Sequence, residues 1–406
     1  MLTGNPAATA FAKTSASLSG LMVAFLAFCC GAVVANLYYA QPIVELIAPQ
    51  IGLSSAKASL IVSLTQFGYA LGLLFLVPLA DLLENRRLVV GLTLAAGVSL
   101  LLAGLSQTPS MFLVFSLLIG LTSVAVQILV PLAAHLAPEA SRGRVVGNIM
   151  SGLLLGILLS RPLSSLLVEA FGWRGVFFSA AALMALIASV TAVALPRREP
   201  THRASYAALI GSVLALARRH AVLRERSLYQ GLLFASFSLF WTIAPIELMR
   251  NHGFNQTQVA LFALVGAVGA IAAPIAGRLA DAGHGRKGTR VALLLAPISL
   301  LIAALPGHGY VGLVACAVLL DFAVQLSMVL GQREVYALDP HSRARLNAVY
   351  MTSIFVGGAL GSLVASPLYE QFGWTVSALA VAVIPALALV LFLARGVRAA
   401  PVARGQ

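Results

Sequence analysis

Charged residues are scarce in this sequence. Asp, Glu, Lys and Arg make up 10% of its 406 residues, and the hydrophobic class makes up 60%. Soluble domains carry about 25% charged residues and hide most of their large apolar side chains in a core. A chain with so little charge cannot bury all of its apolar surface within itself, so lipid must cover part of it. The composition therefore predicts a protein embedded in a bilayer.

Cysteines and catalytic motifs are also few. The three cysteines, Cys29, Cys30 and Cys316, lie inside apolar runs and lack the spacing of a metal site or a disulfide framework. No H-E-x-x-H sequence occurs, and residues 283–289 lack the G-K-[ST] order of a phosphate-binding loop. We therefore expect no enzyme activity, no bound metal and no cofactor.

Acidic residues are outnumbered by basic ones, and the formal net charge is +13. In a basic soluble protein this balance would suggest a nucleic-acid partner. Here the basic residues occupy short loops between apolar runs and form no single patch with interleaved aromatic residues. The pattern excludes nucleic acid as a partner and places the basic residues beside a membrane.

The apolar residues form twelve continuous runs, most of them close to the ~20 residues that a helix needs to cross a bilayer. Because the runs do not alternate between apolar and polar residues, they favour helices over barrel strands. The sequence therefore predicts an all-α membrane protein. Its twelve spans are expected near residues 20–43, 59–79, 88–105, 111–134, 145–168, 175–195, 228–248, 259–279, 291–305, 311–330, 346–368 and 375–394.

The positions of Lys and Arg predict the orientation. With both termini in the cytoplasm, all but four of the 26 basic residues fall on the cytoplasmic side, the exceptions being Lys57, Arg161, Arg174 and Arg250. Cytoplasmic loops hold an excess of Lys and Arg, so we expect a multi-pass protein of a bacterial inner membrane. The expected units are a cytoplasmic N-terminus (1–19), a six-helix bundle (20–195), a cytoplasmic linker with an amphipathic helix (196–227), a second six-helix bundle (228–394) and a cytoplasmic tail (395–406).

The two halves of the sequence repeat each other. Residues 142–173 align without gaps to residues 343–374, and eleven of the 32 positions are identical, including the Phe-Gly-Trp that ends each segment. A second match, offset by 200 residues, pairs Leu79-Ala80-Asp81 with Leu279-Ala280-Asp281. Two parallel six-helix repeats are an architecture of secondary transporters, in which the halves rock about a site at the membrane midplane.

The loops after spans 2 and 8 resemble a family signature. Each contains an Asp followed by a basic pair: Asp81, Arg86 and Arg87 in the first loop, and Asp281, Arg286 and Lys287 in the second. They are similar to the G-x-L-A-D-R-x-G-R-R signature of the major facilitator superfamily. The resemblance covers nearly the whole chain. It implies the major facilitator fold, a monomer, and a cytoplasmic gate formed by these six residues.

The wider sequence is similar to a bacterial branch near drug-proton antiporters and sugar-efflux permeases. Residues 36–42 (Asn-Leu-Tyr-Tyr-Ala-Gln-Pro) are typical of that branch, and so is Leu338-Asp339-Pro340. Two antiporter motifs are missing. Span 4 has Ser116 where the antiporters have an Arg, and residues 161–165 read Arg-Pro-Leu-Ser-Ser instead of G-P-x-x-G-G. These departures argue against drug antiport.

Two ionisable residues lie well inside predicted spans: Arg161 in span 5 and Asp321 in span 10. A charge at the bilayer centre costs about 2.5–3.5 kcal/mol on insertion scales, so such residues usually face a cavity and serve a function. A dry cavity favours the protonated form of a carboxyl, which suits it to carry a proton. We expect Asp321 to carry the coupling proton and Arg161 to bind Asp321 or an anionic substrate. A purely structural ion pair is the other interpretation.

Polar side chains follow one face of several spans. Gln325 lies four residues after Asp321, and Ser123 and Gln127 form a similar stripe on span 4. Such stripes line a cavity or join helices by hydrogen bonds. The resemblance implies that spans 1, 4, 7 and 10 line the pathway. The expected pathway residues are Arg161, Gln325, Gln127, Ser123, Asn36, Tyr39, Gln66, Tyr69 and Trp241.

Together these features predict a secondary transporter, coupled to H+ and working by alternating access, that exports a small organic solute. The alternative is a proton-coupled importer of a small organic anion held by Arg161. A membrane enzyme or a sensor without transport are remote alternatives, and an enzyme would need clustered acids or histidines that the sequence lacks. The expected partners are the bilayer, H+ and a small-molecule substrate.

Overall fold

The structure is a computed structural model, and it describes residues 19–200, 205–305, 307, 309–339 and 342–398. Helices and the turns between them make up this described part, which contains no β-strand. Most of the predicted N-terminal segment (1–19) and the last eight residues of the predicted tail lie outside the described residues.

The helices follow the order that the two-half repeat predicts. The first half contains α1 (Gly20–Ala35), η2 (Gln41–Ile43), α2 (Val44–Gln50), η3 (Ser55–Lys57), α3 (Leu60–Phe75), η4 (Val77–Asp81), α4 (Asn85–Leu105), α5 (Pro109–Thr122), η5 (Ser123–Ala125), α6 (Val126–Leu136), η6 (Glu139–Ser141) and α7 (Arg142–Ala194). After α8 (Tyr206–Arg219), the second half contains α9 (Ala221–His252), α10 (Gln256–Val265), η7 (Gly266–Ile271), α11 (Ala272–Asp281), α12 (Gly285–Ala304), α13 (Gly309–Ala337) and α14 (Arg343–Arg398).

Nine helical segments of the described chain are long and apolar enough to cross a membrane. The two longest, α7 with 53 residues and α14 with 56, each reverse direction at one glycine, so each supplies two spans. The shorter apolar helix α1 supplies the remaining span. The described chain therefore contains twelve spans in two groups of six, and the predicted all-α membrane fold is confirmed.

The two reversals occur in the repeated Phe-Gly-Trp motif. Gly172 has φ 69° and ψ 171°, and Gly373 has φ 71° and ψ −174°. This backbone region is essentially restricted to glycine, because a Cβ atom would clash there. The tryptophan after each glycine anchors the turn, since Trp173 donates to Gln50 Oε1 and Trp374 donates to the backbone oxygen of Ala303, both over 2.8 Å. The motif thus forms the turn between the last two spans of each half.

The first span is interrupted, whereas the sequence predicts one continuous run over residues 20–43. Helix α1 ends at Ala35, residues 36–40 form a turn, and η2 and α2 continue the span to Gln50. Irregular backbone at membrane depth is tolerated only where protein covers it or where it lines a cavity. Here protein covers it: residues 36–40 are all buried, and Ser164 Oγ on α7 donates to the backbone oxygen of Tyr39 over 2.6 Å.

Close helix contacts within each half recur at equivalent positions of the repeat. Gly31 on α1 lies against Gly156 on α7, and Gly231 on α9 lies against Gly357 on α14. A Cβ atom added to Gly156 or Gly357 would overlap the facing backbone. Glycine at these points lets two helix backbones approach closely, as small residues commonly do in membranes.

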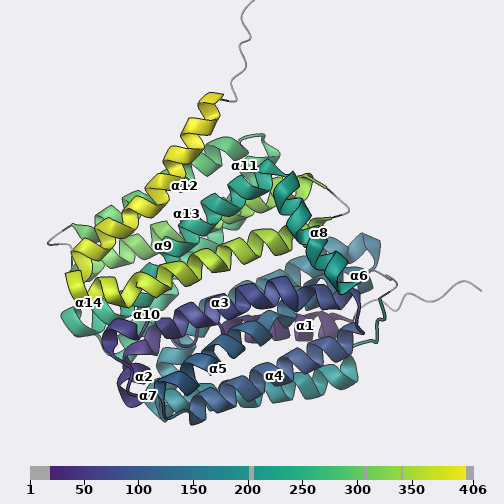
Figure 1. The fold of residues 1–406 in the computed structure, drawn as a ribbon, viewed down its shortest axis with the longest axis horizontal. Helices are drawn as coiled ribbons and strands as arrows, with labels where there is room; N and C mark the ends of the chain where they lie inside the picture. The colour runs from purple at the N-terminus through teal and green to yellow at the C-terminus, as the bar shows by residue number, and fades with distance from the viewer. Residues whose placement is uncertain (1–18, 201–204, 306, 308, 340–341, 399–406) are drawn as a thin grey trace, which may run out of the picture.

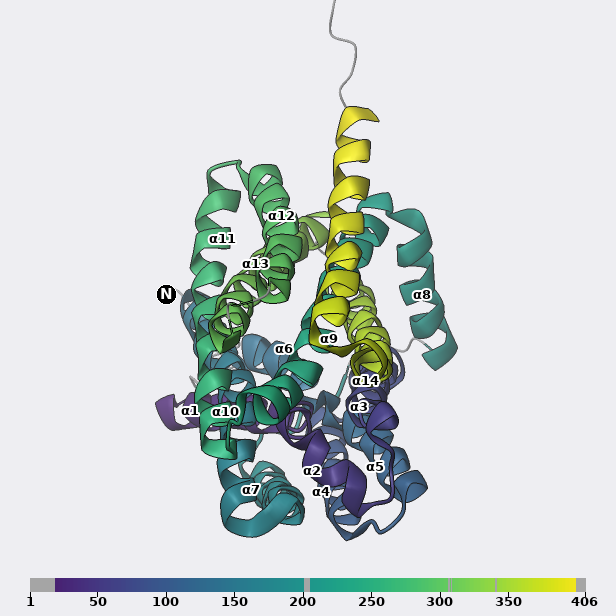
Figure 2. The ribbon, with the colours of Figure 1, turned by 90° about the vertical axis from the view of Figure 1, so that its left-hand side faces the viewer.

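The two halves separate toward one side of the membrane. We call the side with α8, η4 and η6 the arginine-rich side, and the side with α2, Gly172 and Gly373 the opposite side. Helix α10 packs on α7 of the first half, whereas α11 continues the same span by packing on α12 and α13. Figure 1 shows the first half below and the second half above, and Figure 2 shows α11 leading away from the first half.

Helix α8 lies at the arginine-rich side, in the segment where the sequence predicts an amphipathic helix. It buries Val213 and Leu216 and exposes Arg218 and Arg219 at its end. The Tyr206 hydroxyl donates to the backbone oxygen of Phe75 over 2.8 Å, which fixes the start of α8 to the first half. The helix also packs on α14 of the second half.

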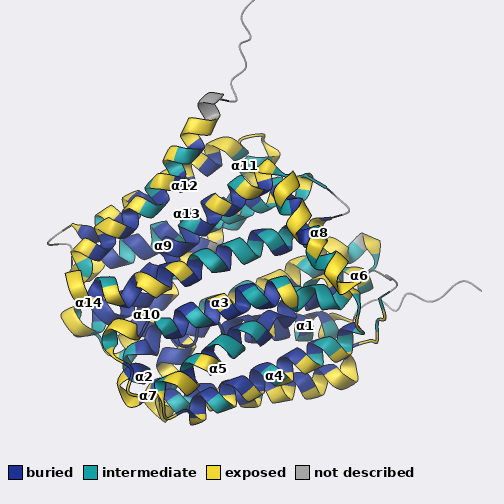
Figure 3. Cartoon of the chain, in the orientation of Figure 1, coloured by how far each residue is buried: buried dark blue, intermediate teal, exposed yellow. Residues whose placement is uncertain are grey.

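Large apolar side chains cover the outer faces of the spans. In Figure 3 the exposed residues lie mainly on the outside of the bundle and the buried ones between the helices. Val193 is 85% exposed and Val383 is 65% exposed. Since water would oppose exposing so much apolar surface, these faces are suited to contact with lipid.

Candidate functional site

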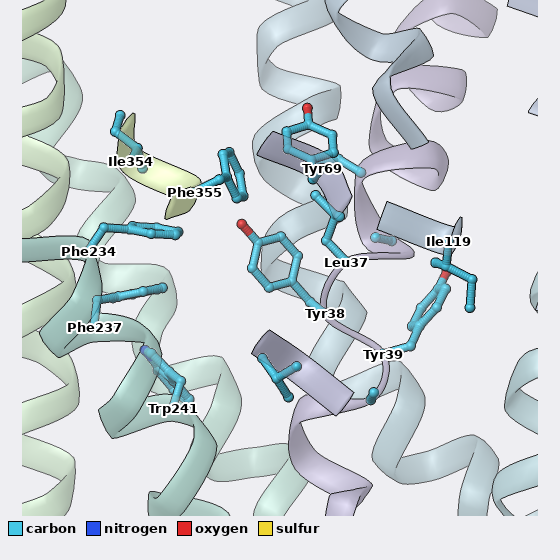
Figure 4. Packing of buried hydrophobic residues seen from close by; sticks show 14 of the residues in the cluster. Leu37, Tyr38, Tyr39, Tyr69, Ile119, Phe234, Phe237, Trp241, Ile354 and Phe355 are labelled. Carbon is cyan, nitrogen blue, oxygen red and sulfur yellow. The ribbon is translucent and has the colours of Figure 1, made fainter. Parts of the chain in front are cut away.

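Arg161 contacts three aromatic rings between the two halves. It projects from α7 and is 4% exposed. Its guanidinium carbon lies 5.0 Å from the ring centre of Tyr38, 5.5 Å from that of Phe237 and 4.4 Å from that of Trp241. Tyr38 belongs to the interrupted first span, whereas Phe237 and Trp241 belong to α9, and Figure 4 shows the three rings facing one another. Cation–π contacts of this kind stabilise a desolvated cation by about 2 kcal/mol.

Gln41 holds the guanidinium of Arg161 from the first span. Arg161 Nε donates to Gln41 Oε1 over 2.9 Å, and Gln41 is 1% exposed. Arg161 Nη2 and Gln41 Nε2 have no hydrogen-bond partner among the described residues. Burying an N–H group without an acceptor costs about 1–3 kcal/mol, and more for a charged group. The site therefore contains two buried donors whose bonding capacity is unused.

Trp241 also contacts Asp321, the second ionisable residue inside the spans. Its indole Nε1 donates to Asp321 Oδ1 over 2.8 Å, and the half-buried Asp321 projects from α13. No ion pair within 4.0 Å joins Arg161 to Asp321. One tryptophan thus connects an arginine of the first half with a carboxylate of the second, and the two charges do not meet directly.

Asp321 packs against the glycine-rich segment η7. A Cβ atom added to Gly266 would lie 2.5 Å from Asp321 Oδ2, and one added to Gly269 would lie 2.7 Å from Asp321 Cβ. A short 3₁₀ segment inside a helix often marks a hinge. The carboxylate therefore lies between α9 and an interruption of the eighth span.

A second polar cluster lies within the first half. Asn36 Nδ2 is 3.3 Å from Ser123 Oγ, and Gln127 Nε2 donates to the Tyr69 hydroxyl over 3.1 Å. The Tyr69 ring reaches the second half, because its centre lies 4.5 Å from that of Phe355 on α14. The structure thus brings together four of the predicted pathway residues, at a place separate from Asp321.

Gln66 of the first half forms a direct hydrogen bond with the second half. Its Nε2 donates to Ser238 Oγ on α9, and Ser238 Oγ is 2.6 Å from Ser362 Oγ on α14. Gln66 Oε1 has no hydrogen-bond partner among the described residues. Ser362 stands at the position of the second repeat that Arg161 occupies in the first. Equivalent positions of the two halves therefore hold a charge and a hydroxyl.

Two predicted pathway residues, Tyr39 and Gln325, belong neither to the site around Arg161 and Asp321 nor to the polar cluster of the first half. Tyr39 points toward Ile119 and away from Phe237 and Trp241 (Figure 4). Gln325 is half-buried on α13 and forms no hydrogen bond with another described residue.

Ionic and polar contacts join the halves at the opposite side. Arg250 on α9 binds Glu45 of α2 in the first half, with Nη2 and Oε2 2.6 Å apart, and it also binds Glu370 of α14 within the second half over 2.7 Å. Thr257, at the start of α10, donates its hydroxyl to Glu169 of α7 over 2.6 Å. Ser59 and Ser366 add a reciprocal pair of bonds from each backbone N–H to the other side chain, of 3.1 and 3.2 Å. These contacts close the opposite side.

Within the part of the chain that the structure describes, the predicted gate residues at the arginine-rich side form no such contacts between the halves. Asp281 binds Arg333 over 2.7 Å within the second half, and Arg87 binds Glu84 over 3.1 Å within the first. Asp81 is exposed beside a cavity of about 100 Å³ that is also lined by Arg345 from α14.

The other three predicted gate residues also stay within their own halves. Arg86 donates to the backbone oxygen of Leu195 over 3.3 Å, and the Arg286 guanidinium carbon lies 5.7 Å from the centre of the Phe392 ring. Lys287 forms no hydrogen bond or ion pair with another described residue. The described contacts therefore close the opposite side, whereas the predicted gate residues do not join the halves at the arginine-rich side.

The family model described as Major Facilitator Superfamily matches residues 22–228 and again residues 226–406. The chain belongs to this superfamily. Its matched relatives include the Uncharacterized transporter YgaY of Escherichia coli O157:H7, 41% identical over 382 residues, which are 94% of this chain and 97% of that protein. The Probable transporter SCO4007 of Streptomyces coelicolor is 35% identical over 363 residues, covering 89% of this chain and 84% of that protein. This major facilitator protein is accordingly a membrane transporter and not an enzyme.

Solved structures share the major facilitator fold at low sequence identity. A bacterial homologue of the human lysosomal transporter Spinster, inward-facing and occupied, superposes with a TM-score of 0.76 at 16% identity, covering 93% of this chain and 96% of that one. The human organic anion transporter MFSD10 (TETRAN) superposes with a TM-score of 0.64 at 20% identity, covering 92% and 98%. At these identities the likeness shows the fold alone.

Two residues of this major facilitator site were missed at the sequence level, namely Tyr38 and Gln41. Both fall in the segment 36–42, of which the sequence indicates only Asn36 and Tyr39 as pathway residues. The available signal was the density of polar and aromatic residues next to Pro42 inside an apolar run. A proline with polar neighbours in a span is a sign of interrupted helix and of a site beside it.

Proposed function

We propose that this protein is a proton-coupled secondary transporter that moves a small organic solute by alternating access. Asp321 is the proton carrier, and Arg161 is its partner across Trp241 or the group that binds an anion. The observation that supports this proposal is the arrangement Arg161–Trp241–Asp321, which joins the two halves through one aromatic side chain. A protonation change at Asp321 therefore acts on a contact between the halves.

The proposed coupling follows from the charge of Asp321. When the carboxylate is ionised, it accepts the indole N–H of Trp241 as a charge-assisted hydrogen bond and attracts Arg161. Protonation removes the charge and weakens both interactions. The resulting loss of attraction between α7 and α13 lowers the barrier to moving one half against the other.

The proposed orientation places the arginine-rich side in the cytoplasm of a bacterial cell, with both termini there, because Lys and Arg are concentrated on that side. The structure then corresponds to a state open toward the cytoplasm. In the outward-open state, the gate residues Asp81, Arg86, Arg87, Asp281, Arg286 and Lys287 form contacts between the halves, and the Arg250 contacts break. The protein works as a monomer, since each chain has both halves of the site.

The direction of transport depends on how solute and proton interact at the site. A cationic or neutral solute that displaces the proton from Asp321 gives antiport, which is the efflux that the sequence favours. A solute that binds Arg161 as an anion gives uptake together with the proton. One observation favours this second candidate: Arg161 is buried, and the described part of the chain supplies neither an acceptor for its Nη2 nor a carboxylate within ion-pair distance.

The proposed function can be tested with purified protein in liposomes that contain a trapped pH-sensitive dye. We expect solutes from a metabolite panel to move protons across the membrane in the wild type, and Asp321→Asn to abolish this movement. Glu225→Gln serves as the matched control, because Glu225 binds Arg395 outside both the site and the gate. Proton movement that survives in Asp321→Asn would show that another group carries the proton.

A further inference from the structure

Two unpartnered donors next to each other in the site point to a specific kind of ligand. Arg161 and Gln41 are 4% and 1% exposed, and one hydrogen bond of 2.9 Å joins them. Arg161 Nη2 and Gln41 Nε2 remain without acceptors among the described residues. Because an unsatisfied buried donor destabilises a protein, a site that keeps two of them is suited to a ligand that supplies the acceptors.

The hydrogen bond between the two side chains fixes which way the donors face. Arg161 Nε can only donate, so the oxygen of the Gln41 amide must face it and Nε2 must remain a donor. In the planar guanidinium, Nη2 lies on the same edge as Nε. Each unused donor therefore lies two covalent bonds from an atom of the existing hydrogen bond, close enough for two oxygens of one planar group to accept from both.

The charge of Arg161 and the aromatic side chains around it restrict the chemistry of the ligand further. Among the described residues, Arg161 is the single cation in contact with the Tyr38, Phe237 and Trp241 rings, so a monoanion neutralises the site and a dianion leaves excess charge in an apolar environment. The aromatic walls, extended by Phe234 stacked 5.1 Å from Phe237, favour an apolar body. A carboxylate on a hydrocarbon or aromatic frame meets these conditions.

We infer that Arg161 and Gln41 form a carboxylate subsite and that the substrate is a small organic monocarboxylate with an apolar body. This inference rests on the proposed transport function and specifies its substrate class. The bound carboxylate accepts from Arg161 Nη2 and Gln41 Nε2, while its apolar body lies against the rings of Tyr38, Phe237 and Trp241.

The inferred subsite also determines the sign of coupling. A carboxylate bound at Arg161 repels a negative charge on Asp321, so its binding favours the protonated form of Asp321. By reciprocity, protonation of Asp321 strengthens carboxylate binding by the same factor. Proton and anion therefore bind together and cross together, in the direction set by the proton gradient.

Equilibrium binding to the full-length protein in detergent tests the subsite without any gradient. The probes are benzoate, phenylacetate and hexanoate, each compared with its neutral amide of nearly the same size. We expect the carboxylates to raise the melting temperature, more at roughly pH 5.5 than at pH 7.5, and the amides to have no effect. Equal shifts from acids and amides, or no shift from any of the three acids, overturn the inference.

Gln41→Glu is the decisive variant, because it places a carboxylate of the protein itself against Arg161. We expect it to fold at least as stably as the wild type and to bind the carboxylates at least ~10-fold more weakly, the size expected for losing a hydrogen bond to a charged group. Gln50→Glu is the matched control. Gln50 also accepts from an arginine, Arg174, over 3.0 Å, but on the opposite side. Unchanged carboxylate binding in a folded Gln41→Glu protein would exclude the subsite.

The same proteins separate this inference from the proposed function. If carboxylates bind and Gln41→Glu abolishes binding, but a pH gradient does not drive their flux, then the subsite holds and the proton coupling fails. If a gradient drives flux of other solutes while carboxylates do not bind, the transport proposal holds and the subsite fails.

Discussion

Trp241 donates its indole N–H to Asp321 over 2.8 Å, and the same ring lies 4.4 Å from the guanidinium carbon of Arg161. Asp321 belongs to the second half of the transporter and Arg161 to the first. Arg161 and Asp321 thus both contact the same side chain, that of Trp241. Any change of charge at one of them alters the environment of the other, which is what coupling between two ligands requires.

Replacing Trp241 by Phe should separate its two contacts. The ring remains near Arg161, whereas the hydrogen bond to ionised Asp321 is lost. Losing a bond to a charged group destabilises the ionised form by about 1.5–3 kcal/mol, and 1.4 kcal/mol corresponds to about one pH unit. We therefore expect the pH of half-maximal proton-driven flux to rise by about one unit or more.

The control for this prediction is Trp374→Phe. Trp374 donates over the same 2.8 Å to the backbone oxygen of Ala303, away from the site. Its pH profile should match that of the wild type. An unchanged profile in Trp241→Phe would show that the indole bond does not influence proton binding.

Adding a methyl group at Gly269 should displace Asp321. The new Cβ atom would lie 2.7 Å from Asp321 Cβ, which is closer than two carbon atoms can pack. Overpacking of this kind costs about 1–3 kcal/mol. We expect Gly269→Ala to lower the melting temperature and to reduce proton-driven flux about tenfold or more. Gly277→Ala, where no atom lies within 4 Å of the added Cβ, should behave like the wild type.

Removing Arg250 should favour opening of the opposite side. Arg250→Gln breaks the bond to Glu45 that joins the halves, and also the bond to Glu370 within the second half. Because these side chains are partly exposed, we expect a change of about 1–2 kcal/mol, or roughly a tenfold shift in the population. Labelling of an introduced Ser366→Cys with an impermeant maleimide measures this, since the described natural cysteines are buried.

Arg174→Gln provides the matched control for the labelling. Arg174 also lies at the opposite side, but its bonds to Gln50 and Ser106 stay within the first half. It should leave the labelling rate of Ser366→Cys unchanged. Equal rates with Arg250→Gln and Arg174→Gln would contradict a role of Arg250 in holding the halves together.

The pair of buried Arg226 and partly exposed Glu334 should stabilise the second half. Arg226 Nε donates to Glu334 over 2.7 Å, and its side chain is 8% exposed. Glu334→Ala leaves a buried guanidinium without its counter-ion, so we expect a loss of about 3 kcal/mol. Glu225→Ala removes an acid from the exposed pair with Arg395 and should cost less than about 1 kcal/mol. Thermal unfolding of the two variants in the same detergent compares these losses, and similar melting temperatures would contradict the prediction.

The sequence by itself determined the spans, the repeat and the family. These properties follow from the length of apolar runs and from identities between the halves, which are read along the chain. It also singled out Arg161 and Asp321, because a charge inside an apolar run is visible without any structure. The Phe-Gly-Trp identity at residues 171–173 and 372–374 likewise located a turn whose glycine conformation only the structure revealed.

Only the tertiary structure decided which side chains meet those two charges. The resemblance implied that span 1 lines the pathway and so favoured Tyr39, but the backbone leaves the helix at Ala35, so the side-chain directions change and Tyr38 faces Arg161. The bond between Arg161 and Gln41 joins residues 120 positions apart, and that between Arg250 and Glu45 joins residues 205 apart. Such contacts depend on how helices that are distant in the sequence pack against one another, and no local pattern in the chain encodes that geometry.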